Sequence, residues 1–367
     1  MLRVRPQPVM GVLDVRVPMK RSTFSGLLTA TAAGVPAFLR YAWAEELVTV
    51  GTVNASSDVP FFIGDKKGFF REQGLAIKWT AFDSAAKMVV PLGANQLDVA
   101  AGAPSAGLYN AVVQGIDLKI VADKGSTPHG FGYMPLLVRS DLAARFTYKD
   151  LKGMKVAEPA QGTTTSSTLN EALKQAKLAY GDVTHEYLGF PNHVAAFAGK
   201  SIEASLTTEP SATLAVRSGN AVRFAGDDVF YPKQQLAVLL YGTNLAQKNR
   251  ELGKRFMAAY IKAVRFYNDG LARDKRTGHG SLTGRNGREI IDILTQYTAV
   301  KDRTIYEQAT PNGNDPDGRV NLESLRKDLA FFKAQGLVTG NVTADAVHDG
   351  SFVDAALKTV GKYKPGR

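Results

Sequence analysis

Apolar residues in the first part of the chain occur in two patterns, as short runs and as helix-spaced stripes. Short apolar runs bounded by turn-forming residues predict strands at 47–53, 75–82, 97–101 and 118–122. Amphipathic spacing between these runs predicts helices at 61–73, 84–93 and 105–114. Strands that alternate with helices are typical of an α/β domain with a largely parallel sheet.

A second cycle of the same kind follows a Gly-rich stretch at 126–133. Its predicted strands lie at 135–139, 155–157, 183–188, 202–206 and 222–224, and its predicted helices at 166–178, 194–199 and 211–218. One more strand, 235–241, precedes predicted helices at 247–269, 288–297, 322–334 and 344–359. The pattern indicates two α/β lobes and a mainly helical C-terminal part.

The two cycles contain matching segments, QLDVAAGAPSA (96–106) and SIEASLTTEPSA (201–212). Each has an acidic residue, Asp98 or Glu203, near the start of a strand, and each opens its helix with Pro-Ser-Ala. Ligands of open α/β sheets bind beyond the carboxyl ends of the strands. Two facing lobes would therefore bring Ser105 and Thr163–Ser166 across one cleft. Chance is the alternative explanation, because strand–Pro–helix units are common.

A run of hydroxyl residues, Thr163–Ser167, stands between a short strand and a helix. One hydroxyl can accept from the orphan N–H groups of the helix start, but the run has more hydroxyls than one cap needs. A helix start also attracts anions, because its free N–H groups and the positive end of its dipole point the same way. The segment is either a well-capped helix start or the cradle of a ligand.

The first 44 residues have the features of a secretion signal. Met19-Lys20-Arg21 is basic, residues 24–39 are apolar and small, and Ala42-Trp43-Ala44 matches a cleavage site. We expect 1–44 to be a signal peptide region, cleaved after Ala44 and using the ordinary secretion route rather than the twin-arginine route. The start codon, Met1 or Met19, stays open. A membrane anchor is the alternative, although the apolar run is short for a span.

The amino-acid composition excludes several classes of protein. The 367 residues include no cysteine, which excludes disulfides, thiolate metal sites and cysteine nucleophiles. The net charge of +11 falls to +6, from 39 basic and 33 acidic residues, when the first 44 residues are left out. No dense Lys/Arg block is present, so we expect no nucleic-acid partner. A mildly basic body is compatible with a small anionic ligand.

The sequence contains no recognisable catalytic constellation. Its five histidines show no metal-binding spacing, and it has neither a G-x-S-x-G elbow nor a P-loop. Asp98 and Glu203 are expected at strand starts, away from the cleft, so they do not support acid–base catalysis. We expect no enzyme activity, no cofactor and no metal.

Four phrases in a fixed order are more specific than any single motif. They are VTVGTVNASSDVPFFIGDKKGFFREQGLAI (48–77), NQLDVAAGAPSA (95–106), LKGMKVAEPAQGTTTSS (151–167) and AAFAGKSIEASLTTEPSATLA (195–215). With them the chain resembles a periplasmic substrate-binding protein of an ABC importer, of the branch that serves nitrate, sulfonate, taurine and thiamine-pyrimidine-precursor uptake. The resemblance covers most of 47–269 and includes the pair Glu209-Pro210. Residues after about 270 do not map onto the family.

This resemblance implies a two-lobed, type II-like periplasmic-binding-protein fold of the α/β class, with two crossover strands. Lobe 1 would comprise 46–128 plus 234–367, and lobe 2 would comprise 129–233. The lobes would close over a small-molecule ligand. A periplasmic location, a monomeric state and a permease partner in the inner membrane are implied too. The implied ligand-facing residues are Asn54, Ser56, Asp58, Ser84, Pro104, Ser105, Thr163, Thr164, Thr165, Ser166, Asn192 and Glu209.

The ligand class stays open between two readings. The hydroxyl-rich helix start and the basic body favour a sulfonate, nitrate or carboxylate. Asp58 and Glu209, if both face the cleft, favour an amine or a pyrimidine-like ligand instead. Each of these residues also has a structural alternative. Asp58 and Ser105 could be helix caps, and Glu209 could pair with other protein groups. His193 is expected to be a surface or capping residue rather than a ligand residue.

Two other functions compete with transport. A pyrimidine-precursor biosynthetic enzyme shares this fold, but its chemistry would require a cysteine, which the chain lacks. A ligand sensor would use the same closure to address a receptor rather than a permease, and the sequence does not separate the two.

Overall fold

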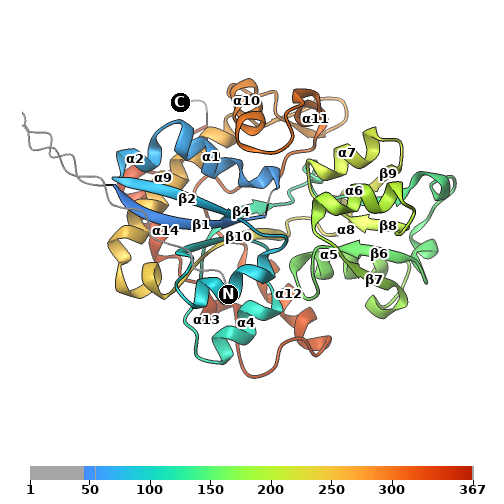
Figure 1. Ribbon diagram of the computed structural model, residues 1–367, viewed down its shortest axis with the longest axis horizontal. Coiled ribbons are helices and arrows are strands. Elements are labelled where there is room, and N and C mark those ends of the chain that lie inside the picture. Colours follow the sequence, from blue (N-terminus) through green and yellow to red (C-terminus); the bar gives the residue numbers. More distant parts are fainter. Residues whose placement is uncertain (1–44, 54, 366–367) are drawn as a thin grey trace, which may run out of the picture. The chain divides into compact units, whose positions relative to one another are not determined.

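Two five-stranded sheets form the framework of the computed structural model, which describes residues 45–53 and 55–365 (Figure 1). The predicted signal peptide and its cleavage site lie outside these residues. In order, the first sheet contains β2 (Leu75–Ala81), β1 (Glu46–Thr52), β3 (Val99–Gly102), β10 (Gln235–Tyr241) and β4 (Lys119–Ser126). The second sheet contains β7 (Thr184–Tyr187), β6 (Lys155–Glu158), β8 (Ala204–Leu206), β5 (Leu136–Arg139) and β9 (Ala221–Ala225).

The two sheets share one topology. In the first, β1 pairs in parallel with β2 and β3, and β10 lies antiparallel between β3 and β4. In the second, β6 pairs in parallel with β7 and β8, and β5 lies antiparallel between β8 and β9. Four strands of each sheet therefore run in the same direction, in agreement with the expectation of a largely parallel sheet, and the one antiparallel strand is the strand by which the chain arrives from the other sheet.

The matching segments of the sequence occupy equivalent places, with β3 and β8 third in their sheets. Asp98 accepts hydrogen bonds from the Thr49 N–H and hydroxyl, at 2.9 and 2.8 Å, and so fastens β1 to the start of β3. Glu203 accepts from the Lys155 N–H at 2.8 Å and fastens β6 to β8 in the same way. The two acidic residues thus have a structural role at the strand starts, as expected.

Helices cover both sheets. Those that follow the strands of the first sheet are α1 (Val59–Lys66), α2 (Phe69–Glu72), α3 (Val89–Gly93) and α4 (Ala106–Val113). Those of the second are α5 (Thr164–Lys174), α6 (Phe190–Ala198), α7 (Ser211–Arg217) and α8 (Asp227–Phe230). Short 3₁₀ turns occur at Ser56–Asp58 (η1), Ala85–Met88, Ser140–Leu142, Tyr148–Leu151 and Tyr180–Asp182.

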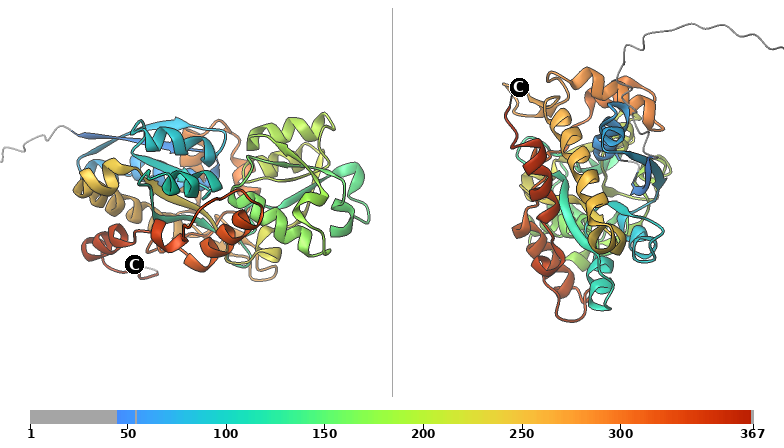
Figure 2. Two further views of the ribbon diagram at one scale, coloured as in Figure 1. Left: turned by 90° about the horizontal axis from the view of Figure 1, so that it is seen from below. Right: turned by 90° about the vertical axis from the view of Figure 1, so that its left-hand side faces the viewer.

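The C-terminal part is mainly helical and returns to the first sheet. It contains a π-helical turn (Asn244–Lys248), α9 (Arg250–Asn268), the hairpin β11 (Ala272–Arg273) and β12 (Gly280–Ser281), α10 (Gly287–Tyr297), α11 (Arg303–Gln308), α12 (Leu322–Ala334), α13 (Ala344–Val347) and α14 (Ser351–Val360). Helix α9 packs against α1, α2 and α14, and Phe61 and Tyr260 form part of the buried cluster there. The red C-terminal helices line one side of the first sheet (Figure 2).

Several predicted elements differ from the observed ones. The helix expected at 61–73 is two helices, because Gly68 adopts a positive φ between them. The last predicted helix, 344–359, is also divided, at Asp349-Gly350. The β11–β12 hairpin, between the helices predicted at 247–269 and 288–297, was not predicted, and α8 and α11 are too short for their periodicity to have been recognised.

Candidate functional site

The loop after β1 contacts the second half of the chain directly. The Ser56 N–H donates to the Glu209 carbonyl at 2.9 Å, and the Ser56 hydroxyl donates to the same oxygen at 3.2 Å. The Ser57 N–H donates to the Tyr133 hydroxyl at 3.3 Å. Ser56 therefore holds β1 and α7 together through the backbone of Glu209. Asn54, predicted beside it, lies outside the described residues.

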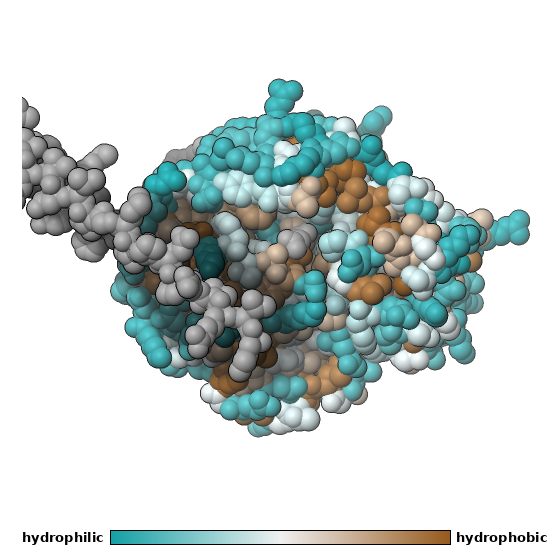
Figure 3. All heavy atoms as spheres, viewed as in Figure 1, coloured by the Kyte–Doolittle hydropathy of each residue, from teal (hydrophilic) through white to brown (hydrophobic). Residues whose placement is uncertain are grey.

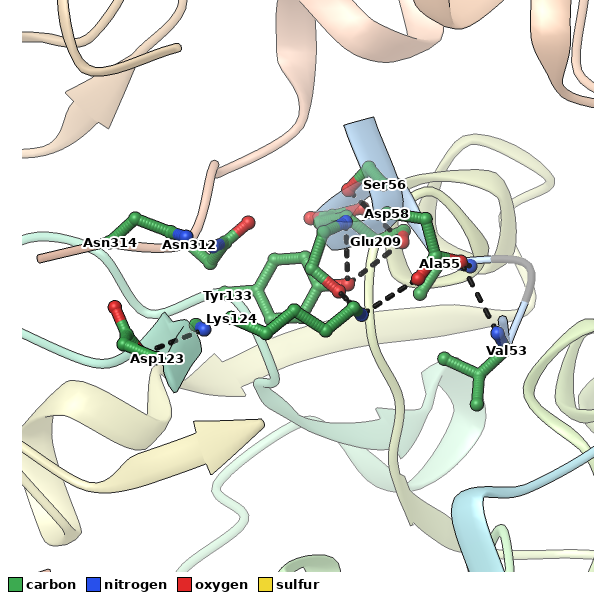
Figure 4. A network of polar contacts seen from close by, with 12 residues as sticks. Val53, Ala55, Ser56, Asp58, Asp123, Lys124, Tyr133, Glu209, Asn312 and Asn314 are labelled. Carbon is green, nitrogen blue, oxygen red and sulfur yellow. Dashed lines mark hydrogen bonds and ion pairs between the residues drawn. The ribbon is translucent and has the colours of Figure 1, made fainter. Parts of the chain in front are cut away.

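Asp58 forms an ion pair that the sequence did not predict. Its Oδ1 lies 2.7 Å from the Lys124 Nζ, and neither side chain is exposed to solvent. Its Oδ2 accepts from the N–H groups of Val53 and Ala55, at 3.3 and 3.1 Å. Asp58 and Lys124 point toward one another from η1 and β4 (Figure 4). The carboxylate is thus neutralised and does not cap α1 through its side chain.

Glu209 is also fully engaged. Its carboxylate pairs with Arg223 of β9 and accepts from the Thr213 N–H of α7 at 2.9 Å. The Thr310 N–H approaches the same carboxylate at 3.4 Å. The Glu209 side chain therefore has the structural role that was the alternative, as a partner of other protein groups. Its carboxylate is not left free to bind an amine ligand.

Two helix starts meet between the sheets, those of α4 and α5. The Ala106 N–H donates to the Gly162 carbonyl at 2.7 Å, and the Thr164 N–H donates to the Pro104 carbonyl at 3.2 Å. These bonds place Ser105 opposite Thr163 in a short antiparallel bridge. The sequence correctly predicted that these segments face each other. The Ser105 hydroxyl accepts from the Leu108 N–H at 3.2 Å and caps α4.

Most hydroxyls at the start of α5 have partners within the protein. The Thr163 hydroxyl donates to the Ala160 carbonyl, the Thr164 hydroxyl donates to the Leu236 carbonyl, and the Ser166 hydroxyl accepts from the Gly162 N–H. Thr165 differs, because its hydroxyl donates to the Met134 sulfur at 3.6 Å, which is a weak acceptor. Within the described residues its N–H has no recorded acceptor. Thr165 therefore has a backbone donor, and a hydroxyl held only weakly, that a ligand could use.

Two predicted residues and one histidine lie apart from this meeting point. Ser84 is buried, and no partner is recorded for its hydroxyl among the described residues. Asn192 is exposed on α6. His193, expected at the surface, is buried instead: its Nδ1 meets the Thr207 hydroxyl, its Nε2 meets the Leu188 carbonyl, and burial lowers its pKa to about 4.

A small cavity of about 30 Å³ lies where the two halves meet. Of the predicted site residues it is lined by Thr164 and Thr165, together with Ala103, Ser57 and Lys124. The remaining wall is mostly apolar and is formed by Val53, Ala55, Gly102, Tyr133, Met134, Phe190, Thr208, Leu236 and Ala237. Ligand pockets commonly measure about 300–1,000 Å³. This conformation is therefore closed, with room for about two water molecules.

The surface offers larger depressions, and one of about 130 Å³ is lined by Arg223 and Thr310, which contact the Glu209 carboxylate. Another of about 500 Å³ is open and lies against the β11–β12 hairpin and residues 313–316, and no predicted site residue lines it. On the face shown in Figure 3, hydrophilic residues cover most of the rim, and hydrophobic residues are exposed nearer the middle. In the part of the chain that the structure describes, no cluster of metal-ligating side chains is found. No helix there is long and apolar enough to span a bilayer.

The site residues that the sequence analysis missed share one property: their side chains become neighbours only in the fold. Lys124 stands in the strand KIVADKGS, where a lysine suggests a solvated edge. Ser57 and Thr208 adjoin predicted residues but belong to no motif. The one available signal was the spacing from Asp58 in the loop after β1 to Lys124 at the first crossing. Asp58 follows β1 and Lys124 lies near the carboxyl end of β4, and these two strands run in the same direction in one sheet, separated by β3 and β10.

Solved structures with the same fold are numerous. The ligand-binding component of an ABC-type import system from Staphylococcus aureus, solved with zinc bound, has a TM-score of 0.70 at 15% identity and covers 85% of this chain and 99% of its own. The alkanesulfonate-binding protein SsuA from Xanthomonas axonopodis pv. citri, bound to MOPS, has a TM-score of 0.64 at 19% identity, covering 83% and 98%. The nitrate-binding protein NrtA from Synechocystis PCC 6803 has a TM-score of 0.67 at 13% identity, covering 86% and 89%.

The fold alone does not fix an activity, since the desulfurization enzyme DSZB also has it, with a TM-score of 0.59 at 14% identity, covering 86% of this chain and 99% of its own. A comparison with curated proteins finds no match. The model of the NMT1-like family matches residues 43–277, more than half of the chain. The two sheets with their shared topology and the two crossings confirm the predicted periplasmic-binding-protein fold, and the chain belongs to the NMT1-like family.

Proposed function

We propose that this protein is an extracytoplasmic solute-binding protein that captures a small anionic organic solute between its two halves. It delivers this solute to an ABC permease in the inner membrane. Residues 1–44 direct it to the periplasm, where 46–128 plus 234–367 form one lobe and 129–233 the other. The protein acts as a monomer, and the solute is a sulfonate, nitrate or carboxylate.

The observation that carries this proposal is the start of α5 at the interlobe cavity. Thr165 contributes a backbone N–H for which no protein acceptor is recorded within the described residues, and a hydroxyl whose recorded acceptor is the Met134 sulfur, a weak one. Free N–H groups at a helix start bind anions, and the helix dipole adds to the attraction. Asp58 and Glu209, on which the amine reading depended, are neutralised by Lys124 and Arg223. An anion is therefore favoured over an amine or a pyrimidine.

A thermal-shift screen of the purified protein, unfolded and refolded to remove carried ligand, tests this function. The panel contains taurine, alkane- and arylsulfonates, nitrate, carboxylates, thiamine pyrimidines and small amines. A ligand at 100 times its dissociation constant stabilises the fold by about 2.7 kcal/mol, which the screen detects. Native mass spectrometry of the protein before refolding shows whether any small molecule is carried at all.

Thr165→Val then tests the assigned position, because valine keeps the shape and removes the hydroxyl. We expect the dissociation constant of the anionic hit to rise by about ten- to a hundredfold. Thr163→Val is the matched control, since the Thr163 hydroxyl donates to Ala160 and does not line the cavity. A hit confined to amines contradicts the assignment of an anionic ligand. Equal affinities of Thr165→Val and Thr163→Val contradict the assignment of the anion to Thr165.

A further inference from the structure

Lys124 is a fully buried cation at the interlobe cavity. Its Nζ donates to the Ser57 hydroxyl at 2.8 Å and lies 2.7 Å from the Asp58 Oδ1. An ammonium group has three donors. Two of them are accounted for by these contacts, and within the described residues no acceptor is recorded for the third. A buried ammonium group with one unused donor is suited to hold an acceptor that is not part of the protein.

Among the described residues that line the cavity, Lys124 is the one with a charged side chain. The other lining residues are apolar residues, glycine or residues with a hydroxyl group. Asp58 stands behind Lys124, where the N–H groups of Val53 and Ala55 fix its Oδ2. The pair has no net charge, so the remaining positive potential at the cavity comes from the start of α5. The helix start supplies about half a positive charge, so one added negative charge would be balanced in part, whereas a second would be left uncompensated.

We infer that Lys124 binds the anionic group of the solute, and that the Lys124–Asp58 pair makes the site selective for a monoanion with an apolar body. The inference rests on the proposed function and names its ligand class more closely. The oxygens of a sulfonate or monocarboxylate accept from the Lys124 ammonium and from Thr165. The apolar body lies against Tyr133, Met134 and Phe190. Dicarboxylates and other dianions are excluded by Asp58.

A purely structural role for the pair makes different predictions. If Lys124 only joins β4 to η1, its replacement changes the stability of the protein and affects the binding of every ligand equally. The preference for charged over neutral ligands then stays intact. If Lys124 binds the solute, the preference for anions over neutral compounds of the same shape depends on it. Selectivity between matched compounds therefore separates the two roles, and stability does not.

The experiment measures dissociation constants of the full chain by calorimetry for three sets of probes. The monoanions are methanesulfonate, propionate and benzoate; their neutral counterparts are methanesulfonamide, propionamide and benzamide; the dianions are malonate and phthalate. The variants are Asp58→Asn and the double variant Asp58→Asn/Lys124→Met, which removes both charges and avoids a lone buried carboxylate. Lys119→Met is the matched control, because Lys119 lies on the same strand, pairs with Asp117 and does not line the cavity.

We expect the wild type to bind at least one monoanion and to reject its amide and the dianions. Asp58→Asn should tighten monoanion binding by about tenfold and admit dianions, because it unmasks the charge of Lys124. The double variant should lose monoanion affinity by about a hundredfold while binding the amide equally or better. Lys119→Met should behave as wild type.

The inference is overturned if the amides bind as tightly as the anions, if the double variant keeps its anion preference, or if no probe of the monoanion set binds. The proposed function has a separate readout, namely carriage of a small molecule in native mass spectrometry and a hit in the broader screen. A neutral or cationic hit there would leave the binding function standing and remove the role of Lys124.

Discussion

Glu209 joins several parts of the fold through both its side chain and its backbone carbonyl. Its carboxylate is buried and held by Arg223 and the Thr213 N–H, while its carbonyl receives Ser56 from the other sheet. Arg223→Met should lower the free energy of unfolding by about 1–3 kcal/mol, because it leaves a buried carboxylate without its cation, although Arg223 itself is partly exposed. Urea denaturation at neutral pH measures this.

The control for Arg223→Met is the double variant Glu209→Gln/Arg223→Met, which removes both charges. It should recover most of the lost stability, since the glutamine oxygen can still accept from the Thr213 N–H. Equal stability of Arg223→Met and the wild type would show that the pair contributes nothing measurable.

Individual site residues could be predicted where a backbone rule fixes them. Ser105 caps α4 with its hydroxyl, as the sequence allowed, whereas Thr163–Ser166 lie at the start of α5 without a side-chain cap, so the capping expected there is not made. The partners of Asp58 and Glu209 could not be predicted, since Lys124 and Arg223 come from strands that only the sheet topology brings near. The sequence analysis could therefore name carboxylates near the cleft but not their charge balance.

Helix α12 connects the C-terminal part to the crossing and to α5. Asp328 of α12 is buried and accepts from the Tyr231 hydroxyl at 2.8 Å, and Lys327 pairs with Glu171 of α5 at 2.9 Å. Burial raises the pKa of Asp328 to about 7, above that of an exposed aspartate. The folded protein therefore binds this proton more tightly than the unfolded chain does.

This proton makes stability depend on pH in a defined direction. The stabilising contribution of protonated Asp328 is complete below pH 4 and is lost as the pH rises through about 7. Asp328→Asn keeps a donor and an acceptor and cannot ionise. It should be more stable than the wild type by on the order of 4 kcal/mol at pH 8, and the difference should nearly vanish by pH 4. Thermal unfolding at both pH values measures this.

Two other buried aspartates, Asp123 and Asp227, also have a pKa raised to about 7 by burial. Stability should consequently still fall from pH 5 to pH 8 in Asp328→Asn, but less steeply than in the wild type. An identical slope in the two proteins would contradict the assignment to Asp328.

Elements were predicted most reliably where the apolar pattern has no internal glycine or proline. Helix α12 matches its predicted range of 322–334, and strand β10 matches 235–241. The antiparallel direction of β10 could not be predicted, because an apolar run has no direction in its pattern. The two α/β lobes followed from the repeated cycle and the matching segments, which need no knowledge of direction, and the periplasmic-binding-protein fold followed from the family resemblance.

The two halves are joined by backbone bonds as well as by side chains, and these bonds decide whether a solute can enter. The cavity between them measures about 30 Å³, so a solute larger than two water molecules requires the halves to separate. Separation would break the bonds of Ala106 to Gly162 and of Thr164 to Pro104. Ser105 and Thr163, the pair between these bonds, would move apart at the same time.

This pair allows opening to be tested by a disulfide, because the natural chain has no cysteine to interfere. Ser105 and Thr163 form the non-hydrogen-bonded type of antiparallel pair, in which the Cα atoms lie about 4.5 Å apart, within the roughly 4.4–6.8 Å range of disulfides. In Ser105→Cys/Thr163→Cys, oxidation should slow association of the panel's tightest anion at least a hundredfold, and reductant should restore it. Ser105→Cys alone, which loses the α4 cap but cannot form the bond, controls for the substitution. Stopped-flow binding gives the rates. Undiminished association in the oxidised double variant would mean that the solute enters without separation of the halves at this contact, and that the closed cavity is reached by local motion of its wall.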